Sequence, residues 1–139
     1  ALGAIHDPVP GYRDILHSRT NRLLNKLSKD KVIFRYNWSV QAGNELCWRP
    51  DLYATQEPAE LYWRVERQTL RRLPETGAIV FGIRIFLESF TRLESRQPGF
   101  TATLREIIEH LPEAQRRYKG LDVLLERPEF SAIILRNST

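Results

Sequence analysis

The chain has 139 residues, of which 42% are hydrophobic and 27% charged, and its formal net charge is +4. These values are typical of one globular domain with its own core and exclude an intrinsically disordered chain. No apolar run approaches the roughly 18 residues that a membrane-spanning helix needs, so we expect no membrane partner. The single cysteine, Cys47, excludes an internal disulfide, and we therefore expect a reducing, cytoplasmic setting.

Arginine supplies most of the positive charge, with seventeen of the 21 basic residues spread along the chain and mostly near acidic ones. A nucleic-acid surface typically shows a Lys/Arg stripe with exposed aromatic residues between, so we expect no nucleic-acid partner. The doublets Arg71-Arg72 and Arg116-Arg117 are interpreted as solvated surface. The preference for arginine over lysine favours planar, bidentate partners such as carboxylates.

The start of the chain predicts that a segment precedes it. The chain has no methionine, and Ala1–Ala4 read as the end of a helix that runs into Ile5–Pro10. We expect the missing part upstream or in a companion chain, and a complete small protein with a trimmed start is the alternative. Residues 1–30 are predicted to be largely helical, because apolar residues recur at helical spacing over Tyr12–Leu27.

Three strands are predicted in the middle of the chain, within residues 31–90. Val32–Val40 is rich in β-branched and aromatic residues. Leu61–Leu73 and Ala78–Phe90 flank a Pro-Glu-Thr-Gly turn, which predicts a hairpin. Residues 41–60 hold Gly43, Pro50 and Pro58 and are predicted to form a loop, with a short strand around Leu46–Trp48.

The C-terminal part, residues 100–139, is predicted to be helical. Thr103 and Glu106 form a capping-box pattern that would open a helix ending near His110. A second helix would run from Pro112 through Tyr118, closed by Lys119-Gly120, and residues 121–126 and 130–135 would be helical too. A helix, three strands and then helices indicate the α+β class with an antiparallel sheet.

Several motifs together carry a family resemblance. The block from Arg64 to Pro74 (RVERQTLRRLP) is the most specific, and it is supported, in order along the chain, by the segments 5–11, 35–38, 77–81 and 118–120. The chain thereby resembles the haem-dependent oxidative N-demethylase alpha-subunit-like proteins. The resemblance implies a Per-ARNT-Sim (PAS)-like fold that holds haem b. It also implies an enzyme that oxidises a small secondary amine with O2.

This resemblance sets the expected domain organisation and partners. Residues 1–139 would be the C-terminal part of a single haem-binding PAS-like domain, contributing its last three strands and incomplete without an upstream segment or companion chain. No flavin or iron–sulfur motif is present, so a reductase or another electron-transfer partner would deliver electrons. Zinc-ligand spacing, a phosphate-binding glycine loop and a nucleophile elbow are also absent from the sequence, which argues against hydrolases, kinases and dehydrogenases.

His6 is the expected haem ligand. The resemblance implies a histidine on the helix that precedes the last three strands, and His6 stands there, before Pro8 and Pro10. The alternative is a capping or surface histidine. His17 and His110 are expected to be solvated. Cys47 is a weaker candidate for a thiolate ligand, since no cation or helix N-terminus nearby would activate it.

Strand alternation sorts the candidate catalytic residues. Arg64 and Glu66 point to one face, where Arg64 could polarise the oxygen site and Glu66 could hold the substrate ammonium. The alternative is an ion pair on a wet sheet face that contributes about 0.2–1 kcal/mol. Arg67 points to the other face with Trp63 and would need a buried partner there. Which face meets the cofactor stays open.

Arg67 and Arg84 are the candidate cofactor-binding residues besides His6, as partners of the haem propionates. Gly82, in the middle of its strand, would allow close approach of a flat ligand or form a bulge. The alternating residues from Ile79 to Leu87 form a continuous apolar face, and Trp38, Trp48 and Trp63 are expected in the core. A haem-binding sensor or carrier without turnover, and an interaction domain of the same fold, are the alternative functions.

Overall fold

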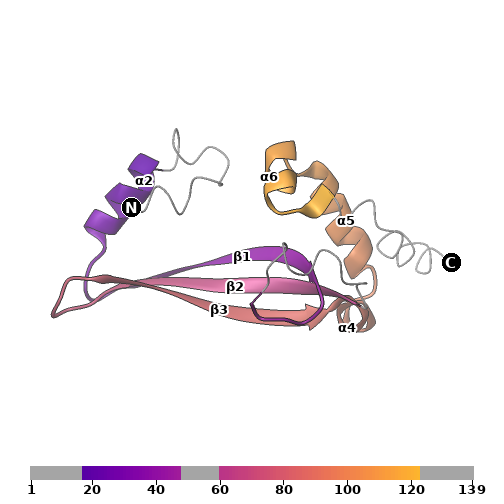
Figure 1. Cartoon of the computed structure of the whole chain (residues 1–139), viewed down its shortest axis with the longest axis horizontal. Helices are drawn as coiled ribbons and strands as arrows, with labels where there is room; N and C mark the ends of the chain where they lie inside the picture. The colour runs from indigo at the N-terminus through magenta and orange to yellow at the C-terminus, as the bar shows by residue number, and fades with distance from the viewer. Residues whose placement is uncertain (1–16, 48–59, 123–139) are drawn as a thin grey trace. The chain divides into compact units, whose positions relative to one another are not determined.

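The computed structural model of the chain describes residues 17–47 and 60–122, and the architecture is that of these residues. Three strands form an open antiparallel sheet in the order β1-β2-β3, with helices before and after it (Figure 1). This confirms the predicted α+β class. The elements are α2 (His17–Lys26), β1 (Val32–Ala42), β2 (Leu61–Arg72), β3 (Ile79–Ser89), α4 (Phe90–Arg96), α5 (Phe100–His110) and α6 (Glu113–Tyr118).

The predicted hairpin between β2 and β3 is confirmed. The Leu73 N–H donates to the Ala78 carbonyl at 2.8 Å, and the Gly77 N–H donates back to the Leu73 carbonyl at 3.0 Å. Gly77 has φ 69°, a left-handed conformation that glycine adopts at little cost. The turn therefore aligns two long strands with one register.

β1 is longer than predicted and ends at Ala42. Beyond it, the Gly43 N–H donates to the Glu60 carbonyl at 2.9 Å, which continues the pairing of β1 with β2. The short strand expected around residues 46–48 is wrong for Leu46 and Cys47, which form a bend. Trp48 lies outside the described residues, as does the part of the predicted N-terminal helix before His17.

The chain groups into two compact units, each described by itself. The first unit comprises residues 1–37 and 66–84, and the second comprises residues 38–65 and 85–139. In the part of the chain that is described, no helix has both the length and the apolar character required to cross a bilayer.

In the first unit, Arg72 ties α2 to the hairpin. Its guanidinium donates to the carbonyls of Leu24 at 2.6 Å, Leu27 at 2.9 Å and Gly77 at 2.8 Å. Carbonyls at the end of a helix have no partner within the helix, so a cation there satisfies them and opposes the negative end of the helix dipole. The interpretation as solvated surface holds for Arg71, which is exposed, and is wrong for Arg72.

In the second unit, the core lies where the sheet meets α5. Its buried apolar residues are Val40, Leu61, Phe90, Phe100, Leu104, Ile108 and Leu121. Trp38 and Trp63 pack against this cluster, as predicted, and the Trp63 and Phe100 ring centroids lie 4.7 Å apart. Burial of these apolar side chains, aliphatic and aromatic, is the dominant stabilising contribution in this core.

In the second arginine doublet, Arg116 and Arg117 also have different roles. Arg116 donates to the carbonyls of Glu109 and Leu111, at the end of α5, and pairs with Asp122 at 2.8 Å. Arg117 forms an exposed pair with Glu113 on α6. The helix from Pro112 to Tyr118 is confirmed, whereas the interpretation of Arg116 as solvated surface is wrong.

The short helix α4 was not predicted, and the capping box at Thr103 and Glu106 is wrong. α5 begins at Phe100, so that Thr103 lies within its first turn. The carboxylate at its N-terminus is that of Glu94, which accepts from the N–H groups of Gly99 at 2.6 Å and Thr101 at 2.9 Å and from the Thr101 hydroxyl at 2.8 Å. A residue on the preceding helix thus caps α5 through space.

Glu94 should stabilise the protein in a pH-dependent way. Burial raises the pKa of its carboxyl, but the hydrogen bonds from Thr101 and Gly99 lower the pKa more, so it lies below its ordinary value. Because the folded-state pKa is depressed, this stabilisation is present above the unfolded-state pKa of about 4.3 and is lost as pH falls through the folded-state pKa.

We therefore expect Glu94→Gln to lower the free energy of unfolding at pH 7 by about 1–2 kcal/mol, allowing for solvent screening of a partly exposed group. The difference from the wild type should shrink below about pH 4. Urea unfolding at several pH values measures both effects. Glu109→Gln, which alters an exposed pair with Arg105, is the matched control. A difference that is the same at pH 3 and pH 7 would contradict this assignment.

Candidate functional site

Arg64 and Glu66 each have side-chain hydrogen bonds in the structure. In the second unit, Arg64 Nη1 donates to the Gln41 side chain at 3.2 Å and to the Leu46 carbonyl at 2.9 Å. In the first unit, Glu66 accepts from the Gln68 amide at 3.0 Å. These contacts anchor Arg64 to the segment that follows β1, and they give Glu66 a neutral donor. His6 lies outside the described residues.

Gln68 continues the polar chain that begins at Glu66. Its side chain is buried, and its carbonyl oxygen accepts from Arg35 Nε at 2.8 Å. Arg35, Gln68 and Glu66 thus form a relay of hydrogen bonds across β1 and β2 in the first unit. Such a relay orients the Glu66 carboxylate and holds a positive charge two side chains away.

Arg67 is exposed, so the expected buried partner is not needed, and that prediction is wrong. Its guanidinium carbon lies 5.3 Å from the centre of the Phe34 ring, a cation–π contact. The Phe34 and Tyr36 rings are 56% and 61% exposed and lie edge to face with centroids 6.1 Å apart. One face of the first unit therefore presents aromatic rings and a cation together.

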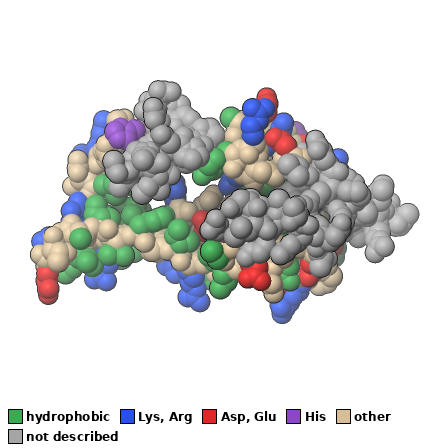
Figure 2. Space-filling view, viewed as in Figure 1, with side chains coloured by type: hydrophobic (Ala, Val, Ile, Leu, Met, Phe, Trp, Pro, Cys, Tyr) green, Lys and Arg blue, Asp and Glu red, His purple; other side chains and the backbone are tan. Residues whose placement is uncertain are grey.

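Arg84 lies on the same face as Arg67. The Thr69 hydroxyl donates to the Gly82 carbonyl at 3.3 Å, so Thr69 and Gly82 are opposite each other on β2 and β3. Counting two residues along each antiparallel strand places Arg67 beside Arg84. Both guanidinium groups belong to exposed residues. The space-filling view shows hydrophobic side chains exposed on the surface of the strands, with Lys and Arg side chains near them (Figure 2).

The structure explains why residue 82 is a glycine. A Cβ atom at this position would lie 2.8 Å from Thr69 Oγ1, closer than real Cβ contacts allow. Thr69 is β-branched and has few rotamers with which to move away. The glycine therefore makes room for the cross-strand threonine, and neither a flat ligand nor a bulge is required to explain it.

A cavity of about 700 Å³ opens in the second unit, within the range typical of ligand sites. β2 and β3 supply one wall and α4 and α5 the other, and the lining includes Trp63, Phe86, Glu88, Phe100, Leu104 and Ile107. The Trp63 indole N–H is buried and has no hydrogen-bond partner among the described residues. An unsatisfied buried donor costs about 1–3 kcal/mol, so an acceptor brought in by a ligand would be favoured.

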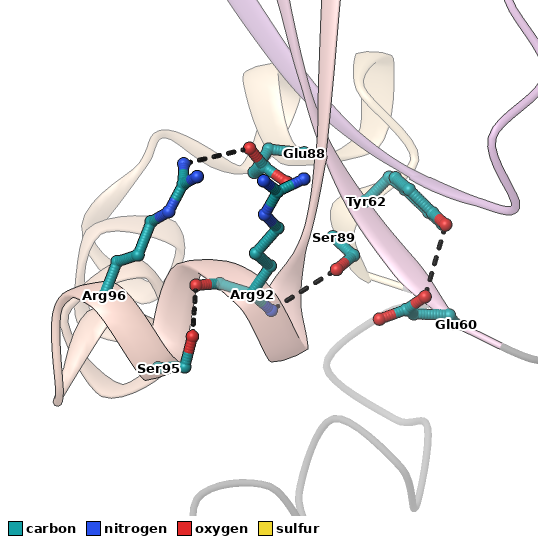
Figure 3. A network of polar contacts seen from close by, with 7 residues as sticks. All are labelled: Glu60, Tyr62, Glu88, Ser89, Arg92, Ser95 and Arg96. Carbon is teal, nitrogen blue, oxygen red and sulfur yellow. Dashed lines mark hydrogen bonds and ion pairs between the residues drawn. The ribbon is translucent and has the colours of Figure 1, made fainter.

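Glu88 is the acidic side chain of this lining. Figure 3 shows Arg92 and Arg96 of α4 both turned toward it, at 3.6 Å and 3.3 Å. The two arginines are 63% and 60% exposed, so solvent screens both pairs. On the neighbouring strand β2, the Tyr62 hydroxyl donates at 3.2 Å to Glu60, which immediately precedes that strand. Burial, then the hydrogen bond and charge of Glu60, then the charge of Glu88 raise the pKa of Tyr62.

Sequence reasoning missed Phe86 and Glu88 as site residues. Strand alternation alone puts them on the face opposite Ile85 and Leu87, and this signal was available. Their position next to Trp63 depends on the register of the hairpin and on the packing of α5 against the sheet. Neither can be read from a single strand's pattern.

The described residues offer few potential iron ligands. Within residues 17–47 and 60–122, no three His, Cys, Asp or Glu side chains gather as a metal site would require. His17 and His110 are exposed, as expected, and contact Asn21 and the Glu106 carbonyl respectively. Cys47 is exposed too.

Haem needs an apolar surface, cations for its two carboxylates and one axial ligand. In the first unit, the face with Phe34, Tyr36, Arg67 and Arg84 fits the first two needs, because exposed rings and guanidinium groups occur together there. The axial ligand would come from outside the described residues. The residues present therefore fit one side of a haem.

Comparison with known families gives a match that covers most of the chain. The family model described as haem-dependent oxidative N-demethylase, alpha subunit-like, matches residues 1–127. The matched range contains every candidate site residue, His6 included.

Proposed function

Because the chain belongs to the haem-dependent oxidative N-demethylase, alpha subunit-like family, we propose that it forms part of an oxygenase that demethylates a small secondary amine. The reaction would use O2 and electrons from a separate reductase. The observation that carries the proposal is the family match over residues 1–127, which implies dependence on haem. That the haem is haem b, and that the amine is small and secondary, are parts of the proposal.

Haem, when bound, would supply the oxygen chemistry that amino-acid side chains lack. The chain's own residues would hold it in place. The His6 imidazole would ligate the iron, and Arg67 and Arg84 would bind the two carboxylates. The exposed Phe34 ring beside Arg67 supports this role of the first unit, because a flat apolar group can stack there while its carboxylates meet the guanidinium groups.

The proposal extends to the organisation of the protein. Residues 1–139 would be the C-terminal part of a PAS-like haem domain, which an upstream segment or a companion chain completes. The words "alpha subunit-like" in the family's description support a companion chain. The open three-stranded sheet is compatible with this, because β1 and β3 are its outer strands among residues 17–47 and 60–122, and further strands can pair with outer strands.

Glu66 is the proposed amine-binding carboxylate, with Arg64 polarising the oxygen site. Glu66→Gln keeps the shape and removes the charge, so it should raise the Michaelis constant for the amine about 10- to 150-fold, which corresponds to roughly 1.5–3 kcal/mol. Haem content should stay unchanged. Steady-state kinetics together with the haem absorbance tests this. Loss of haem or of stability with normal amine affinity would instead make Glu66 a structural partner of Gln68.

The function itself is tested first by the absorption spectrum of the intact protein. A Soret band separates a haem protein from an interaction domain that binds no cofactor. Reductant-dependent release of formaldehyde from dimethylamine then separates the oxygenase from a haem-binding sensor or carrier. A haem protein that releases no formaldehyde with any reductase would favour the sensor or carrier.

A further inference from the structure

Gln68 is a buried side chain between two charged ones in the first unit. It is 8% exposed, and its amide joins Arg35 of β1 to Glu66, which lies two residues earlier on β2. We propose that Gln68 is a positioning residue, which holds the Glu66 carboxylate in the orientation that binds the substrate ammonium. The inference deepens the proposed function and rests on it for the assignment of the amine to Glu66.

The chemistry of its two neighbours allows the Gln68 amide only one orientation. A guanidinium group can only donate hydrogen bonds, and an ionised carboxylate can only accept them. Arg35 Nε therefore faces the Gln68 carbonyl oxygen at 2.8 Å, and the Gln68 amide nitrogen faces Glu66 Oε2 at 3.0 Å. Turning the amide over would bring donor against donor and acceptor against acceptor. Glu66 thus receives this hydrogen bond from a fixed direction.

The burial of Gln68 makes both of its hydrogen bonds costly to lose. A buried amide that loses a partner keeps the full cost of its removal from water. β2 lies between β1 and β3, so backbone pairing on both sides holds the strand that carries Glu66 and Gln68. Alternation puts these two side chains on one face of β2. Gln68 therefore moves less than an exposed side chain would, and so does the carboxylate oxygen that it holds.

A carboxylate held in this way can bind an ammonium without first being ordered. It has about four acceptor positions, so Glu66 can accept from Gln68 and from a substrate N–H at the same time. Ordering a side chain on binding costs affinity, and a side chain that is already ordered avoids this cost. Loss of the Gln68 amide should therefore weaken amine binding although the charge of Glu66 remains.

A double-mutant cycle tests this role, because a residue that acts through Glu66 loses its effect once Glu66 is replaced. The probe is dimethylammonium chloride, and calorimetry on the intact protein, with and without haem, measures its dissociation constant in the absence of turnover. Gln68→Met preserves the length of the side chain and removes both hydrogen bonds. We expect it to weaken binding roughly tenfold, and by less than about twofold in the Glu66→Gln protein.

Arg35→Met is a second variant, which changes an exposed residue and decides the question if Gln68→Met does not fold. It removes the group that fixes the amide, so it should weaken binding about threefold, again only when Glu66 is present. Gln115→Met, at an exposed position of α6, is the matched control and should leave the dissociation constant unchanged. A thermal transition for each variant confirms that it is folded.

The positioning role is overturned if Gln68→Met binds the probe as tightly as the wild type does. It is also overturned if the variant weakens binding equally with and without Glu66, since a general structural role gives that result. In both cases a loss of affinity in Glu66→Gln still supports the amine site of the proposed function. An unchanged affinity in Glu66→Gln contradicts that site and overturns the inference with it. A cycle that holds in a protein without haem supports the positioning role and contradicts the oxygenase.

Discussion

Replacing Arg72 by methionine should lower the free energy of unfolding by about 2–4 kcal/mol, because three carbonyl oxygens lose a charged donor at once. The Leu24 carbonyl lies in the last turn of α2 and the Leu27 carbonyl lies one residue beyond the helix, where carbonyl groups lack a complete set of partners within the helix. Methionine preserves the apolar stem of the side chain, so the loss reports on the guanidinium and not on packing. Denaturation by urea at pH 7 measures the change.

Arg71→Met is the matched control for this prediction. The two arginines are adjacent on β2, but Arg71 is exposed, so its replacement should change stability by no more than about 0.5 kcal/mol. Arg72→Lys should fall between the wild type and methionine, since lysine keeps the charge but lacks the planar fork that reaches three carbonyls. Equal effects of the Arg71 and Arg72 replacements would show that Arg72 does not anchor α2.

His6→Ala should abolish or greatly weaken haem retention in the intact protein, because it would remove the proposed axial ligand of the iron. Added imidazole should partly restore the spectrum by occupying the vacated position. The Soret band of the variant, measured with and without imidazole, reports the result. The prediction comes from the position of His6 before Pro8-Val9-Pro10 and from the family to which the chain belongs.

His17→Ala and His110→Ala are the controls for His6. Both histidines are exposed on helices in the structure, and their replacement should leave the spectrum unchanged. An unaltered spectrum in His6→Ala would move the ligand to another chain or to a segment beyond this sequence. A changed spectrum in His17→Ala would instead identify α2 as the ligand-bearing helix.

The β2–β3 hairpin could be predicted from the sequence because its signals are local. Two runs rich in β-branched and aromatic residues meet at Pro-Glu-Thr-Gly, and Gly77 takes the positive φ that the turn needs. The signals for the helix that follows Pro112 are local too, since proline precedes its first residue and Gly120 follows its end. Chain neighbours supply these effects, so no knowledge of the fold is needed.

The α5 cap could not be predicted from neighbouring residues. Thr103 and Glu106 carry the usual pattern, yet Glu94, on the preceding helix, holds the N–H groups of Gly99 and Thr101. A carboxylate that arrives through space satisfies the same backbone donors as a local cap, and packing of α4 against α5 decides which is used. The same limit applies to Arg72, whose partners on α2 lie 45 and 48 residues away in sequence.

By itself, the sequence determined the class of the fold, the order of its strands along the chain and the family, because these depend on periodicity, turn residues and motif order. The tertiary structure alone decided which side chains share a site. It joined Arg64 to Gln41 and Glu66 to Gln68, and it brought Trp63, Glu88 and Phe100 to one cavity. The physical reason is that strand register and helix packing join residues far apart in sequence, and those contacts leave no local pattern.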